Sequence, residues 1–127
     1  MTVQVIDFPS VFTKVHLDYV EQYVVKTARQ IFGGRLRDII LYGSYARGDY
    51  REWSDVDILV IADVSNEEAI RLDNELADAL SDLNYSMNLL LSIIVVPFSR
   101  FKYLENHYPF YINVRKEGIS LCLMSNT

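Results

Sequence analysis

The chain has 127 residues, of which 50% are hydrophobic and 13% aromatic, so it can form an apolar core and is not a disordered chain. The formal net charge is −5, from 17 acidic and 12 basic residues. This acidic balance argues against broad nucleic-acid binding and suits a basic protein partner. A single cysteine, Cys122, excludes an internal disulfide and favours a reducing compartment.

The chain opens without the charged and apolar pattern of a signal peptide. Its longest apolar stretch, 89–97, is too short to span a bilayer as a helix. We therefore expect a cytoplasmic protein with no membrane contact and no direct nucleic-acid partner.

The first predicted elements are a short arm over 1–8 and a helix that ends at Phe32. Ser10 is the expected N-cap of this helix, and Gly33-Gly34 is expected to end it in a left-handed turn. We expect 1–34 to form an N-terminal arm and helix, and 35–127 to form the core, within one domain over 1–127.

Three apolar runs predict buried strands, at 39–42, 57–61 and 89–96. Between the second and third runs, Ser65 and Glu68 form a capping box that starts a helix with apolar residues at three- to four-residue spacing.

The last part of the chain predicts two short helices and an edge strand. Ser99 is expected to cap a helix that ends near Asn106, a second helix is expected over 108–117, and 119–123 is expected to form a last strand. The alternation predicts an α/β (α+β) fold: a small mixed β-sheet of three to four strands with helices packed on it.

The central motif is Gly43-Ser44, followed by ten residues and then Asp55-x-Asp57. In a strand, Asp55 and Asp57 project from the same face about 7 Å apart. Such a pair suits a hard divalent cation such as Mg²⁺. The glycine–serine turn exposes backbone N–H groups that can bind phosphate. Together these features predict a site for a nucleoside triphosphate with Mg²⁺.

Each residue of the turn has a proposed role and an ordinary structural one. Gly43 would allow close approach of a phosphate, or would be a plain turn glycine. Ser44 would offer its hydroxyl and N–H to a phosphate, or would cap the next helix. Arg47, three residues later, would contact a phosphate or pair with a nearby carboxylate.

The motif resembles the signature of the DNA polymerase β-like nucleotidyltransferase superfamily. The continuation through Arg47 and Gly48, with Ser54 before the first aspartate, resembles its minimal branch, the MntA-type antitoxins of HEPN/MNT toxin–antitoxin pairs. The resemblance implies transfer of AMP from ATP to a tyrosine hydroxyl of a HEPN ribonuclease toxin, which is thereby neutralised in a hetero-oligomer. It also implies two Mg²⁺ ions at Asp55 and Asp57, with Gly43, Ser44 and Arg47 binding the nucleotide.

One feature departs from the family pattern, which usually adds a third carboxylate from a later strand. No Asp or Glu occurs between Asp82 and Glu105, and only Asn88 or Ser92 is available in that region. This departure leaves an alternative: an antitoxin with little or no activity that inhibits its toxin by direct binding. A small-molecule acceptor such as an aminoglycoside is less favoured, because such relatives carry an additional helical domain.

Tyrosines surround the motif at 42, 45 and 50. They would stack on a base, line a docking surface or pack in the core.

Overall fold

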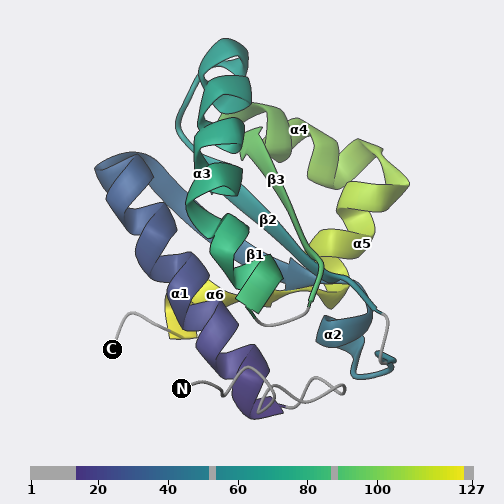
Figure 1. The fold of residues 1–127 in the computed structure, drawn as a ribbon. Helices are drawn as coiled ribbons and strands as arrows, with labels where there is room; N and C mark the ends of the chain where they lie inside the picture. The colour runs from purple at the N-terminus through teal and green to yellow at the C-terminus, as the bar shows by residue number, and fades with distance from the viewer. Residues whose placement is uncertain (1–13, 52–53, 87–88, 125–127) are drawn as a thin grey trace.

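The computed structural model describes residues 14–51, 54–86 and 89–124 (Figure 1). The expected arm over 1–8 and the N-cap at Ser10 lie outside these residues. Helix α1 (Lys14–Phe32) ends where predicted, because Gly33 takes a φ of 57°, a left-handed conformation that glycine adopts without steric cost. A short 3-10 helix, η2 (Gly33–Arg35), then leads into the sheet.

The sheet has the order β3-β2-β1-β4 and is mixed. Strand β1 (Leu36–Tyr42) runs antiparallel to β2 (Val56–Ala62) and to the two-residue β4 (Ile119–Ser120). Strand β3 (Leu91–Pro97) runs parallel to β2. The predicted fold class, a small mixed sheet with helices packed on it, is therefore confirmed.

Helices cover both faces of the sheet, which explains why β1 is apolar over 39–42 and β2 over 58–62. Helices α1 and α3 (Asn66–Ser86) pack on one face, against side chains that include Ile39, Leu41 and Val60. Helices α4 (Phe98–His107) and α5 (Pro109–Glu117) pack on the other face, against Ile40, Tyr42 and Leu59 among others (Figure 1).

The predicted capping box at the start of α3 is confirmed. The hydroxyl of Ser65 accepts a hydrogen bond from the amide of Glu68 (3.1 Å), and the Glu68 carboxylate accepts one from the amide of Ser65 (2.9 Å). Each group thus satisfies an amide that a helix start leaves without a partner.

Two local predictions are wrong. Pro97, not Ser99, is the N-cap of α4, and no side chain caps that helix. The segment 119–123 pairs with β1 only through Ile119 and Ser120, and the chain then turns into the short helix α6 (Leu121–Met124). Pro97 has an extended backbone two residues before the serine, and the helix begins at Phe98, before Ser99 is reached.

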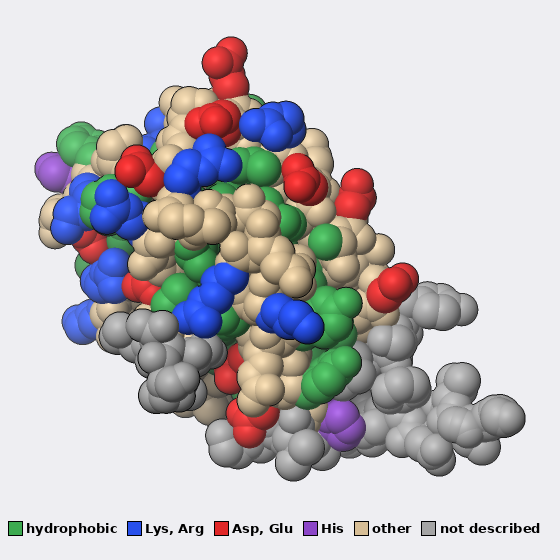
Figure 2. Space-filling view, turned by 90° about the vertical axis from the view of Figure 1, so that its left-hand side faces the viewer, with side chains coloured by type: hydrophobic (Ala, Val, Ile, Leu, Met, Phe, Trp, Pro, Cys, Tyr) green, Lys and Arg blue, Asp and Glu red, His purple; other side chains and the backbone are tan. Residues whose placement is uncertain are grey.

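Charged side chains of both signs are interspersed on one face of the molecule. On the face shown in Figure 2, Lys and Arg side chains lie among Asp and Glu and among hydrophobic side chains. None of the helices that the structure describes has both the length and the apolar character needed to cross a membrane.

Replacing Ser65 with alanine should lower the free energy of unfolding by about 1 kcal/mol, because the cap is lost. Ser99→Ala is the matched control and should be neutral, because that hydroxyl caps no helix. Urea denaturation of both variants measures the difference. Equal losses in the two variants would contradict the capping geometry.

Candidate active site

The antiparallel pairing of β1 and β2 brings the two halves of the sequence motif together. Tyr42, the last residue of β1, is the register partner of Asp57, near the start of β2. Gly43-Ser44 therefore leaves the sheet at the same end at which Asp55 and Asp57 enter it. Helix α2 (Ser44–Arg47) begins at the serine, and the ten residues between Ser44 and Asp55 complete this helix and form a loop.

Gly43 lies against the carboxylate of Asp57. Its φ is 77°, and a Cβ atom at this position would lie 2.5 Å from Oδ2 of Asp57. Both the backbone conformation and the space exclude other residues. Gly43 is also the N-cap of α2, so Ser44 is the first residue of that helix and not its cap. The alternative role considered for Ser44 is therefore wrong.

Hydrogen bonds fix the loop on both sides of α2. The carbonyl oxygen of Gly43 accepts hydrogen bonds from the amides of Ala46 and Arg47, both at 3.1 Å. Before the aspartates, the hydroxyl of Ser54 accepts one from the amide of Arg51 at 2.8 Å. The turn and the acidic pair are thus held at the end of the sheet by local contacts.

The two aspartates differ in their surroundings. Asp55 is exposed and Asp57 is partly buried. Burial raises the pKa of Asp57, the negative charge of Asp55 raises it further, and the positive charge of Arg47 lowers it. The two carboxylates repel each other, so a cation placed between them would relieve that repulsion.

A third acidic ligand is not found in the described residues. Within 14–51, 54–86 and 89–124, no three His, Cys, Asp or Glu side chains gather in a way that would hold a metal ion. The register partner of Asp57 on β3 is Ser92. Paired residues of parallel strands share a face of the sheet, so Ser92 lies on the face of Asp57. Asn88, the other candidate, lies outside the described residues.

Arg47 forms ion pairs with two carboxylates, which is one of the two roles that the sequence suggests for it. Its Nε lies 3.2 Å from Oδ2 of Asp49, and one of its terminal nitrogens lies 3.6 Å from Oε1 of Glu117. All three side chains are about half exposed, so each pair contributes little to stability. The positive charge of Arg47 lies close enough to Asp57 to lower the pKa of that carboxyl.

A pocket of about 250 Å³ opens beside Gly43, between the end of β1 and one face of α5. On the sheet side it is lined by Tyr42, Gly43 and Arg47. On the helix side it is lined by Phe110, Asn113, Val114 and Glu117.

No local sequence pattern indicates this pocket, because its two walls are about 70 residues apart in the chain. The pairing of β4 with β1 brings them together, since Ile119 pairs with Leu41, two residues from Gly43.

The three tyrosines near the motif have different positions. Tyr45 is buried in the core beneath α1 and α3, where its ring stacks on that of Tyr50 at 4.2 Å. These two rings pack the loop and do not line the pocket. Tyr42 does line it, and burial, with the nearby charge of Asp57 and the nearby Tyr111, raises the pKa of its hydroxyl to about 12.

Replacing Gly43 with alanine should lower the free energy of unfolding by about 1–3 kcal/mol, because alanine is strained at this φ and its Cβ displaces Asp57. Gly34→Ala is the control, since no atom lies within 4 Å of a Cβ there and its φ is not left-handed. Urea denaturation compares the two. The geometry is contradicted if Gly43→Ala is as stable as Gly34→Ala.

Comparison with known proteins identifies the family. The family described as "Nucleotidyltransferase domain" matches residues 10–118. A curated protein of Methanocaldococcus jannaschii, named "Putative protein adenylyltransferase MJ0604", is 38% identical over 94 residues, which cover 74% of this chain and 86% of that protein.

Solved structures resemble the chain more distantly. A toxin–antitoxin crystal structure with AMP-PNP is 24% identical, covers 80% of this chain and 71% of that one, and has a TM-score of 0.48. A mutant of the toxin–antitoxin MntA-HpeT is 22% identical, with the same coverage and TM-score. On the family match and the curated relative, this chain belongs to the nucleotidyltransferase domain family.

Proposed function

We propose that this chain is the antitoxin of a HEPN-domain ribonuclease toxin and neutralises it by transferring AMP from ATP to a tyrosine hydroxyl. The observation that carries the proposal is the contact between Gly43 and the Asp57 carboxylate, which sets one member of the acidic pair against the turn proposed to bind phosphate. Membership of the nucleotidyltransferase family supports nucleotide transfer. The similarity to a curated protein adenylyltransferase supports a protein acceptor.

The residues present fit Mg²⁺. Mg²⁺ in nucleotide enzymes is commonly held by one or two carboxylates, with phosphate oxygens and water completing its coordination. Asp55 and Asp57 supply that number of carboxylates and repel each other without a cation. When bound, Mg²⁺ neutralises charge on the triphosphate and on the departing pyrophosphate.

The chain's own residues orient the reactants. Gly43 has no Cβ, so the Asp57 carboxylate lies directly against the turn, and Ser44 offers a hydroxyl at the start of α2. In the transfer, the tyrosine oxygen bonds to the α-phosphorus of ATP, the bond to the bridging oxygen of the β-phosphate breaks, and the hydroxyl proton passes to solvent. Orientation and charge neutralisation supply most of the catalysis.

Arg47 is suited to bind the triphosphate. Its present partners, Asp49 and Glu117, are exposed carboxylates, and exposed pairs are weak. A triphosphate carries more negative charge than either carboxylate and accepts bidentate hydrogen bonds from a guanidinium. Arg47 therefore exchanges one or both partners for phosphate at little cost.

A second function, inhibition by contact alone, is favoured by Ser92. The neighbour of Asp57 on β3 is a serine, where the family pattern leads one to expect a carboxylate. Such a site would bind nucleotide and transfer it slowly or not at all. The net charge of −5 does not separate the two functions, because the chain binds a protein partner in both and an acidic chain suits a basic one.

The experiment is the intact mass of the cognate HEPN toxin after incubation with this protein, ATP and Mg²⁺. We expect the toxin to gain one or more AMP units. An Asp55→Asn, Asp57→Asn variant should reduce the rate at least about a hundredfold, because it removes both anionic ligands. An Asp78→Asn, Asp82→Asn variant, altered on the exposed side of α3, is the charge-matched control and should retain the activity.

An unchanged toxin mass, together with inhibition of the toxin by both the wild type and the aspartate variant, would overturn the transferase proposal. The second function, a contact inhibitor, would then stand.

A further inference from the structure

The pocket beside Gly43 has a wall whose chemistry changes along its length. Phe110, Asn113 and Glu117 lie on one face of α5, because residues three, four and seven apart share a helix face. From Phe110 to Glu117 the helix rises about 10 Å. The wall is acidic beside Gly43 and Arg47, carries an amide in the middle and is aromatic at the far end.

This order matches the order of groups in a nucleotide. Gly43 and Arg47 lie at the end where the triphosphate is proposed to bind. Glu117 comes next and offers carboxylate oxygens, which accept hydrogen bonds from hydroxyl groups such as those of a ribose. Asn113 and Phe110 lie about one and two helical turns before Glu117 on α5, in the order in which a base would follow its ribose.

The far end of the pocket suits a planar base. The ring of Phe110 is 45% exposed, and it packs edge-on against Tyr42, with ring centroids 5.5 Å apart. Tyr42 is buried and belongs to β1, so its ring gives the ring of Phe110 a fixed surface to pack against. An exposed aromatic ring on a rigid support is a stacking platform for a base.

The amide of Asn113 selects between bases. It has one acceptor and two donor hydrogens, so it can accept from the exocyclic amine of adenine while donating to N7 on the same edge. Guanine presents two acceptors, O6 and N7, on that edge, so an amide in either orientation leaves its own oxygen facing an acceptor. The side chain is exposed at the pocket, and no hydrogen bond that the structure describes occupies it.

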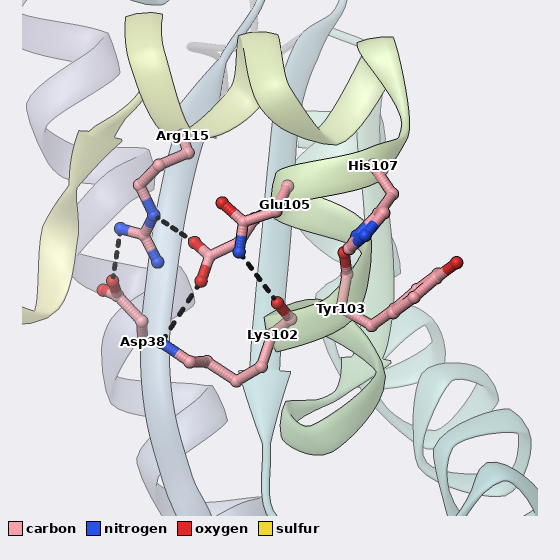
Figure 3. A network of polar contacts seen from close by, with 7 residues as sticks. Asp38, Lys102, Tyr103, Glu105, His107 and Arg115 are labelled. Atoms are coloured by element: carbon pink, nitrogen blue, oxygen red, sulfur yellow. Dashed lines mark hydrogen bonds and ion pairs between the residues drawn. The ribbon is translucent and has the colours of Figure 1, made fainter.

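Helix α5 is held firmly enough to serve as such a wall. Figure 3 shows Arg115 on α5 reaching both Glu105 on α4 (3.0 Å) and Asp38 on β1 (3.8 Å). Burial works to raise the pKa of Glu105, but the hydrogen bonds from Arg115 and Lys102 outweigh it and lower that pKa. Asp38 also accepts a hydrogen bond from the hydroxyl of Ser120 at 2.6 Å, which ties β4 to the same network.

We infer that the pocket between Tyr42, Gly43 and α5 binds the ribose and base of the nucleotide, with Phe110 stacking on the base and Asn113 selecting adenine. The inference rests on the proposed function, and it adds the residues that determine the nucleotide used.

The test measures the binding of the imido analogues of ATP and GTP, with Mg²⁺, by isothermal titration calorimetry. Wild type should bind the ATP analogue about tenfold or more tightly than the GTP analogue. Asn113→Asp should lower this ratio, because a carboxylate accepts only and cannot donate to N7 of adenine. Asn106→Asp, an equal charge change on exposed α4, should leave the ratio unchanged.

A second pair of variants tests the stacking. Phe110→Ala should weaken the binding of both analogues about tenfold, because stacking does not distinguish bases. Ile112→Ala, which removes a similarly exposed side chain outside the pocket, should not weaken binding.

The outcomes separate the two proposals. Nucleotide binding that is equally tight for both analogues and unaffected by Asn113→Asp and Phe110→Ala would overturn this inference and leave the transferase proposal standing. The absence of binding to either analogue would overturn both.

Discussion

The site depends on one contact, the packing of the Asp57 carboxylate against the bare Cα of Gly43. It joins the end of β1 to the start of β2, and it is available only because residue 43 has no Cβ and a φ of 77°. The register of β1 and β2 sets the two residues opposite each other. A slip by one residue would turn Asp57 to the other face of the sheet.

The rest of the fold holds that contact in place and builds a wall beside it. Helices α1 and α3 cover one face of the sheet and bury Tyr45, so the turn after β1 is anchored in the core. Helices α4 and α5 cover the other face. The β4–β1 pairing and the Arg115 network then bring Glu117 next to Arg47. Segments far apart in the sequence thus share one pocket.

Local signals predicted most of the fold and the acidic half of the site. The Ser65–Glu68 box, the turn at Gly33 and the apolar runs act over a few residues, so the sequence displays them directly. The motif at Gly43 and Asp57 was recognisable from its spacing. Asn113, Phe110 and Glu117 were not, because only the β4–β1 pairing places them at the site. The prediction of Ser99 as the N-cap of α4 was wrong because Pro97, two residues earlier, is the N-cap of that helix.

The most direct test of the account is whether Asp55 and Asp57 hold a metal ion together with a nucleotide. Electron paramagnetic resonance of Mn²⁺, used in place of Mg²⁺, measures this in the presence of the imido analogue of ATP. The account predicts that wild type binds Mn²⁺ with the analogue, and that Asp57→Asn weakens this binding about tenfold or more. Equal binding of Mn²⁺ by both proteins would contradict it.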